Sequence, residues 1–138
     1  MNHRRHFLST VVTSAILFAS GQVLAASPTV EIIAMPHPPV KMALAQLREW
    51  LAAQGNKLRV KEIDSESAEG MKRMQSVGLS GHIPVLILID GQHRLKRKDG
   101  SQVEFVNFPN MPNTPPGARG EWTTAEVQAI LTERMKQP

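Results

Sequence analysis

The chain has no cysteine and no tyrosine among its 138 residues, and it has only four phenylalanines and two tryptophans. Because the thiolate is the nucleophile of thiol–disulfide chemistry, the absence of cysteine excludes that activity for this chain. It also excludes disulfide bonds, so the stability must come from packing. The 16 basic and 12 acidic residues form no basic stripe with interleaved aromatic side chains. We therefore expect no nucleic-acid partner.

The first residues have the layout of an export signal peptide, which we predict over 1–26. Arg4 and Arg5 precede a central apolar stretch, and Ala25 and Ala26 supply small residues for cleavage. The apolar stretch is too short to span a bilayer, so no stable membrane anchor is expected after cleavage. Without the two arginines, 14 basic and 12 acidic residues remain, a formal charge of +2. The expected location is the periplasm of a bacterium or its exterior.

Within this segment, RRHFLS resembles the twin-arginine export motif, in which two arginines precede a variable residue, a phenylalanine and a leucine. The resemblance implies export by the twin-arginine route. An ordinary secretory signal that contains two arginines is the alternative, because the pattern is short.

The remainder, 27–138, is long enough for one domain and alternates between strand-like and helix-like patterns. The expected elements, in order, are a strand over 30–35, a helix with an apolar face from Val40 to Leu51 that ends at Gly55, a strand over 57–64, a short helix over 68–77, a buried strand within 82–90, a β-hairpin over 92–108 with its turn at Asp99-Gly100, a Pro-rich loop over 109–122 and a C-terminal helix over 124–136.

Short local patterns indicate where the later helices begin. Ser65 or Ser67 can cap the short helix, and Thr123 with Glu126 fits a capping box before the last one. In the hairpin, the cluster of basic residues beside the turn, 96–98, is interpreted as solvated charge that prevents edge-to-edge pairing. These patterns predict structure and not function.

The stretch GHIPVLILIDGQ resembles the thioredoxin and glutaredoxin segment in which a cis-proline opens a buried strand, and Pro84 holds that place. VEIIAMP followed by a helix resembles the glutaredoxin strand that leads into the Cys-Pro-x-Cys site. With one deletion allowed, HPPV falls where that tetrapeptide would be, so that His37 replaces the nucleophilic cysteine and Val40 the resolving one. The resemblance implies an α/β, thioredoxin-like fold with a central mixed sheet of about four to five strands flanked by helices.

The resemblance also implies a site without sulfur chemistry. In the family, the helix N-terminus and the cis-proline loop form a groove that docks extended peptide. Carried over to this chain, the groove consists of Met35, Pro36, His37, His82, Ile83 and Pro84. The expected function is then that of a redox-inactive protein-binding or envelope assembly factor, with an envelope protein or peptide as its partner. Cysteine-free domains of this kind resemble assembly components of conjugative pilus systems.

Two alternatives remain open. Met35, His37 and His82 could bind copper, because a thioether with two imidazoles suits Cu(I). His37 could instead act as a general acid or base, although the nearby sequence offers no evident partner carboxylate; Asp64 and Glu66 are interpreted as helix-capping residues. Met71 and Met74, one turn apart on the short helix, are interpreted as core residues.

Overall fold

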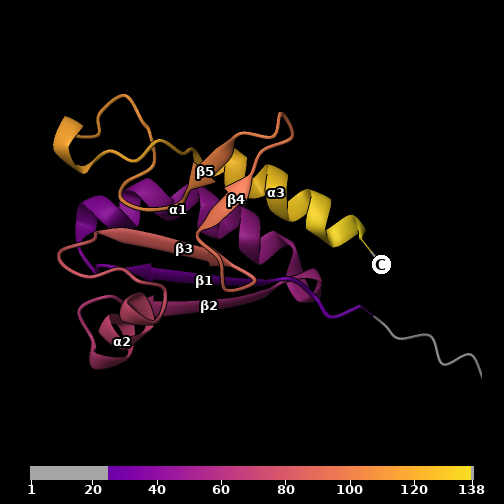
Figure 1. Ribbon diagram of the computed structural model, residues 1–138, viewed down its shortest axis with the longest axis horizontal. Coiled ribbons are helices and arrows are strands. Elements are labelled where there is room, and N and C mark those ends of the chain that lie inside the picture. Colours follow the sequence, from indigo (N-terminus) through magenta and orange to yellow (C-terminus); the bar gives the residue numbers. More distant parts are fainter. Residues whose placement is uncertain (1–24, 138) are drawn as a thin grey trace, which may run out of the picture.

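The computed structural model describes residues 25–137, which form a mixed α/β fold (Figure 1). All but the last two residues of the predicted signal peptide, 1–26, lie outside this range. The elements are β1 (Thr29–Ala34), α1 (Pro38–Ala53), the 3-10 helix η1 (Gly55–Lys57), β2 (Arg59–Asp64), α2 (Ala68–Ser76), β3 (Val85–Ile89), β4 (Arg94–Lys96), β5 (Gln102–Glu104), η2 (Pro116–Ala118) and α3 (Thr124–Lys136).

A three-stranded mixed sheet lies at the centre, with the order β2-β1-β3. β1 runs parallel to β2, with Val30 opposite Val60, and antiparallel to β3, with Ile32 opposite Ile87. Because β1 and β2 are parallel and β3 is antiparallel to β1, the carboxyl ends of β1 and β2 lie beside the beginning of β3, at the same end of the strands. We call this end of the sheet the sheet edge. This edge lies at the left of Figure 1.

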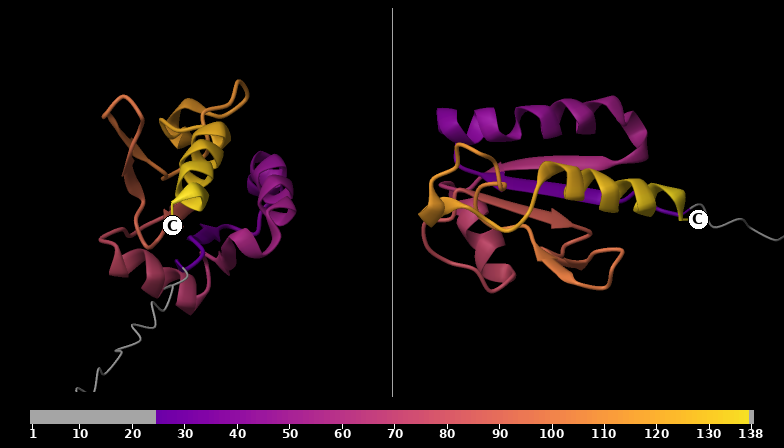
Figure 2. Two further views of the ribbon diagram at one scale, coloured as in Figure 1. Left: turned by 90° about the vertical axis from the view of Figure 1, so that its right-hand side faces the viewer. Right: turned by 90° about the horizontal axis from the view of Figure 1, so that it is seen from above.

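Two hydrophobic clusters cover the two faces of the sheet. The larger one packs α1 and α3 against one face, and the smaller one packs α2 against the other (Figure 2). All five residues of β3 are buried and alternate between the clusters: Val85, Ile87 and Ile89 belong to the larger, Leu86 and Leu88 to the smaller. The prediction of a strand buried on both faces is confirmed.

The helix boundaries follow the local patterns closely. α1 begins with two prolines after His37, and the buried residues of its apolar face are Val40, Leu44, Leu47 and Leu51. Ser67, not Ser65, caps α2, because its hydroxyl accepts a hydrogen bond from the amide of Gly70. The capping box at α3 is confirmed, with Thr123 and Glu126 bonded reciprocally.

The predicted sheet of four to five strands is wrong in one respect, since β4 and β5 form a separate two-stranded sheet. Residues 105–107, directly after β5, pair with β3 in place of a full strand. The amide of Ile87 donates to the carbonyl of Phe105 at 3.0 Å, and that of Asn107 donates to the carbonyl of Val85 at 2.8 Å. The left-handed backbone of Asn107, at φ 71°, then ends the pairing. The hairpin itself turns away to pack beside α3 (Figure 1).

The expected cis peptide bond before Pro84 is also wrong, because no cis bond occurs among residues 25–137. The trans form is the ordinary state of such a bond and is favoured by about 0.5 to 1 kcal/mol before any tertiary contact acts. Here the carbonyl of Pro84 accepts a hydrogen bond from the amide of Met35 at 3.0 Å. That bond holds Pro84 beside the end of β1.

The Pro-rich loop, 109–122, is tied to the domain at both ends. The residue before it, Phe108, forms an isolated bridge with Arg119. At its other end Trp122 is fully buried, and its indole N–H donates to the carbonyl of Val106 at 3.0 Å. The ring of Trp122 meets that of Phe105 edge to face at a centroid distance of 5.6 Å.

Within the described range, 25–137, every helix is too short or too polar to cross a membrane.

Candidate functional site

A cavity of about 460 Å³ lies at the sheet edge where β1 and β2 end and β3 begins. We call it the groove cavity and define it by its lining residues: Met35, His37, Pro39, Val40, Glu66, His82, Pro84, Asn107, Phe108, Gly117 and Ala118. The structure thus brings together four of the six predicted groove residues. Pro36 lies outside the lining and is exposed, and Ile83 lines a neighbouring cavity instead.

Backbone hydrogen bonds at the strand ends place these side chains. Beyond β1, the amide of Met35 donates to the carbonyl of Pro84 at 3.0 Å, and beyond β2 the amide of Ser65 donates to the carbonyl of Ala34, also at 3.0 Å. The chain segments that carry Met35, Glu66 and His82 are therefore held at one edge by the sheet ladder. The sequence predicted this meeting of segments only through the family resemblance.

His37 has a carboxylate partner, which the sequence interpretation missed. Its Nε2 lies 3.0 Å from Oε1 of Glu66, and the two side chains are 52% and 47% exposed. Glu66 is held in turn because its amide donates to Oδ1 of Asp64 at 2.8 Å. The predicted capping role of Glu66 is therefore wrong, since Ser67 caps α2 and Glu66 reaches across to the first residue before α1. The pair can orient an imidazole at the mouth of the groove cavity.

His82 is the least restrained of the predicted residues. It is exposed, and within residues 25–137 neither its backbone nor its ring takes part in a hydrogen bond. The next residue, Ile83, donates its amide only to the carbonyl of Gly81, at 3.1 Å. The backbone N–H and C=O of His82 are consequently available to an extended chain that enters the groove cavity.

The Pro-rich loop forms the far wall of the groove cavity, and sequence reasoning gave it no role in the groove. The amide of Phe108 donates to the carbonyl of Ala118 at 2.9 Å, and the amide of Gly120 donates back to Phe108 at 2.7 Å. These bonds fold 108–120 into a closed loop whose small residues Gly117 and Ala118 face the cavity. The prolines predicted a loop, but nothing in the sequence predicted which surface it would cover.

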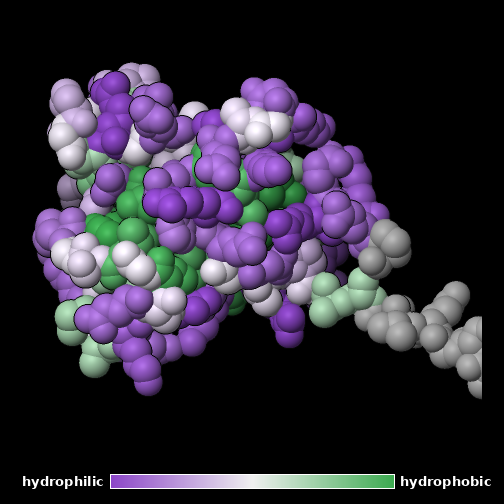
Figure 3. All heavy atoms as spheres, viewed as in Figure 1, coloured by the Kyte–Doolittle hydropathy of each residue, from purple (hydrophilic) through white to green (hydrophobic). Residues whose placement is uncertain are grey.

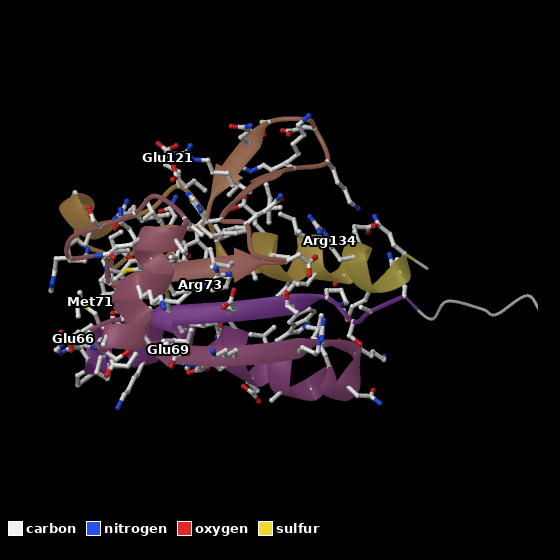
Figure 4. All side chains as sticks on the ribbon, turned by 60° about the horizontal axis from the view of Figure 1, so that its bottom comes forward. Glu66, Glu69, Met71, Arg73, Glu121 and Arg134 are labelled. Carbon is white, nitrogen blue, oxygen red and sulfur yellow. The ribbon has the colours of Figure 1, made fainter. Side chains whose placement is uncertain are left out.

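A second cavity of about 280 Å³ lies beside the first and shares three of its residues, Met35, Glu66 and His82. We call it the methionine cavity and define it by its lining residues: Met35, Ser65, Glu66, Met71, Met74, Gly81, His82 and Ile83. Figure 4 places Glu66 and Met71 at the same end of α2. The hydroxyl of Ser65 is buried and has no hydrogen-bond partner within the described residues. Met74 is a core residue as predicted, but Met71 is 48% exposed.

A third cavity, of about 680 Å³, lies between the β4–β5 hairpin and α3, away from the predicted site. Arg97 and Glu126 are among its charged lining residues, and Nε of Arg97 donates to Oε1 of Glu126 at 2.6 Å. Burial raises the pKa of Glu126, but the hydrogen bond from Arg97 and those from Thr123 outweigh burial and leave the pKa below its ordinary value. Figure 3 shows apolar atoms at the surface beside the hairpin, ringed by polar ones.

In chemical terms the groove cavity can hold an apolar side chain of a bound chain, and it can present an imidazole paired with a carboxylate. Among residues 25–137 no three histidine, aspartate or glutamate side chains gather into a group that could hold a metal ion. Met35 and His82 of the predicted copper set line both cavities, whereas His37 lines only the first. Comparisons of the chain with protein-family models, with curated proteins and with solved structures find no match.

Proposed function

We propose that the chain is an exported, redox-inactive protein with a thioredoxin-like fold, and that it binds an extended segment of an envelope protein or peptide in the groove cavity. One observation carries the proposal. Met35, His37, His82 and Pro84, which the sequence resemblance assigns to a peptide groove, come from two chain segments that lie about 45 residues apart in the sequence, and they line a single cavity. The proposed role is assembly or scaffolding in the envelope, and the absence of cysteine excludes thiol–disulfide chemistry.

Two features support the thioredoxin-like assignment. The element order is strand, helix, strand, helix, then the buried strand β3, the β4–β5 hairpin and a final helix, as the resemblance implies. Residues 105–107 extend the three-stranded sheet at the β3 edge, which gives the sheet a fourth, short member. The trans bond before Pro84 departs from the family motif, yet Pro84 keeps its position beside the end of β1 through the bond to Met35.

The chemistry of the groove cavity favours an extended peptide with an apolar anchor. Met35 and Val40 are buried apolar residues of its floor, and Phe108 on the opposite wall is half-buried. The volume, about 460 Å³, lies in the range of small-ligand pockets and suits one or two apolar side chains of a bound chain. The unpaired backbone of His82 can then form strand-like hydrogen bonds to that chain.

Site-specific photo-crosslinking tests the proposal. A photoreactive phenylalanine analogue replaces His82 or Phe108 in the full chain, and the matched control replaces Met42, which is 72% exposed on α1. We expect a discrete set of envelope adducts from the two groove positions and none from the control. Adducts that form equally from all three positions, or only from the control, contradict a binding site in the groove cavity.

A second candidate function rests on the His37–Glu66 pair. A carboxylate 3.0 Å from a histidine can orient the ring for general acid or base catalysis. Hydrolysis of p-nitrophenyl acetate measures this capacity, with His82→Gln as the control for a groove histidine without a carboxylate partner. If catalysis is the function, both His37→Gln and Glu66→Gln lower the rate and His82→Gln does not. Equal rates for all three variants and the unchanged chain exclude it.

A further inference from the structure

The methionine cavity combines residue types that neither the core nor the groove requires. Its thioethers come from two separate segments: Met35 follows β1, and Met71 and Met74 lie three residues apart on α2. Residues three apart on a helix share a face, so both α2 methionines point toward the end of β1. Core packing accounts for Met74, which is 4% exposed, but it does not account for Met71, which is 48% exposed.

The exposed side of the cavity carries an imidazole. His82 lies on the loop before β3 and shares the cavity lining with the three methionines. The four side chains differ in burial. The thioethers of Met35 and Met74 are buried, whereas the thioether of Met71 and the imidazole of His82 are exposed. A ligand can therefore reach the buried sulfurs through the mouth at Met71 and His82.

The one hydroxyl of the cavity lining, that of Ser65, does not compete for a ligand. The hydroxyl of Ser65, a residue that is only 3% exposed, is buried in the cavity wall without a hydrogen-bond partner in the described part of the chain. Because that oxygen is shielded from the cavity, the groups that a ligand in the cavity can reach are the methionine sulfurs and the imidazole of His82.

We propose that the methionine cavity binds one Cu(I) ion through the thioethers of Met35, Met71 and Met74 and the imidazole of His82. Thioether sulfur is a neutral, polarisable ligand that favours Cu(I) over harder cations, and imidazole also binds copper. Met35 belongs to the larger hydrophobic cluster and Met74 to the smaller, and both line this cavity of about 280 Å³. Binding therefore requires both sulfurs to turn into the cavity, which unbranched side chains with three rotatable bonds permit. Zn²⁺ and Mg²⁺ are disfavoured, because the cavity lining offers only one imidazole, His82, and one carboxylate, Glu66, which is already paired with His37.

This proposal does not rest on peptide binding. Met71 and Met74 line only the methionine cavity, and Phe108 lines only the groove cavity. A change at either of these positions therefore acts on one site. The copper set predicted from the sequence is altered, because His37 faces Glu66 and the two α2 methionines replace it.

The test titrates the full chain with Cu(I) alone, under reducing conditions, in competition with a chromogenic Cu(I) chelator. Carbon-13 labels on the methionine methyl groups report each sulfur separately by NMR. We expect uptake of one Cu(I) per chain, with shifts at Met35, Met71 and Met74 and none at Met42 or Met111. The last two residues are exposed and lie outside the cavity, so they report adventitious binding to free thioethers.

Leucine variants assign the ligands, because Met→Leu keeps volume and apolarity and leaves the fold intact. We expect Met71→Leu/Met74→Leu to weaken Cu(I) affinity by at least about tenfold and His82→Ala to weaken it as well, whereas Met42→Leu/Met111→Leu leaves it unchanged. Phe108→Ala also leaves Cu(I) affinity unchanged while it removes peptide crosslinking. If the double variant of α2 does not fold, the single variant Met71→Leu at the exposed position replaces it, and we expect this variant also to bind Cu(I) more weakly than the unchanged chain.

The absence of uptake overturns the proposal. Uptake that Met71→Leu/Met74→Leu does not weaken, or methyl shifts that are equally large at Met42 and Met111, also overturn it.

Discussion

Single residues in this fold carry consequences that composition does not reveal, and His93 is one of them. Its ring is 12% exposed, and its Nε2 lies 3.4 Å from Oε1 of Glu104. Burial is the largest influence on the pKa of His93 and lowers it. The charge of Glu104 raises this pKa and the charge of Arg94 lowers it, and the net result is a pKa below the ordinary value of 6.5. The folded chain therefore favours the neutral imidazole.

We predict that the free energy of unfolding falls as the pH falls below about 6.5, because in that window the unfolded chain binds the proton more readily than the folded one. Urea unfolding at about pH 7.5 and about pH 5.5 measures the change in the free energy of unfolding. Carboxylates with lowered pKa values add little to that change, because they become protonated only in more acidic solution. His93→Gln should flatten this dependence, whereas the same change at the exposed His82 should preserve it. An unchanged slope in His93→Gln contradicts the prediction.

Gly70 is a second residue whose role comes from its surroundings. It lies in the first turn of α2, where that helix packs over the end of β2. A Cβ at this position would lie 2.1 Å from the carbonyl oxygen of Asp64, which is backbone and cannot move aside. The glycine therefore sets how closely α2 approaches the sheet and, through α2, where Met71 and Met74 lie.

Gly70→Ala should lower the free energy of unfolding by about 1 to 3 kcal/mol, the usual cost of forcing an extra methyl group into a packed contact. Gly117→Ala is the matched control, because a Cβ there meets no atom within 4 Å. It should stay within about 0.5 kcal/mol of the unchanged chain. Chemical denaturation of both variants decides, and equal stability of the two would show that α2 can shift away from β2 freely.

Among the elements, the β4–β5 hairpin departs most from its expected role. Its basic residues were interpreted as solvated charge, and Lys98 fits that interpretation with a side chain 82% exposed. Arg97 does not fit. Besides Glu126 on α3, it donates to the carbonyls of Gln102 at 2.6 Å and Glu121 at 3.1 Å. One side chain thus joins the hairpin, the end of the Pro-rich loop and the first turn of α3.

Arg97→Gln should therefore lower the free energy of unfolding by about 1 to 2 kcal/mol, since it removes charge-assisted hydrogen bonds that are partly shielded from water. Lys98→Gln, the adjacent change of the same charge, should alter it by less than about 0.5 kcal/mol, as is usual for exposed ion pairs. Thermal unfolding of the two variants gives the comparison. Equal losses would mean that Arg97 acts only through the net charge of the hairpin.

At the scale of the whole molecule, the sequence predicted what is encoded locally. The start of α1 at two prolines, the capping box at Thr123 and the buried alternation of β3 depend on residues within a few positions of one another. For the candidate groove, the family resemblance placed Met35, His37, His82 and Pro84 together, and these four residues line one cavity; that they form a binding site stays a prediction. The resemblance was needed there, because local pattern places the strand ends along the chain but not beside one another.

The sequence did not predict contacts between distant segments. The pairing of His37 with Glu66 joins residues 29 positions apart, and no periodicity links them. The wall formed by Phe108 and Ala118 depends on how an irregular loop folds back. The trans peptide bond before Pro84 departs from the family motif, and no neighbouring residue type predicts it. Each of these is a choice among locally similar conformations that only tertiary contacts decide.

The pairing of residues 105–107 with β3 makes a prediction about the whole sheet. If these residues extend the central sheet, their amides open only when the core opens, because β3 is fully buried between both hydrophobic clusters. Amide hydrogen exchange should then protect Asn107, which donates to Val85, to nearly the same degree as Ile87, which donates to Phe105. Asp99, exposed at the hairpin turn, should exchange rapidly. An Asn107 amide that exchanges as fast as that of Asp99 would mean that the central sheet ends at β3. Residues 105–107 would then not act as the fourth strand that the proposed thioredoxin-like fold requires beside β3.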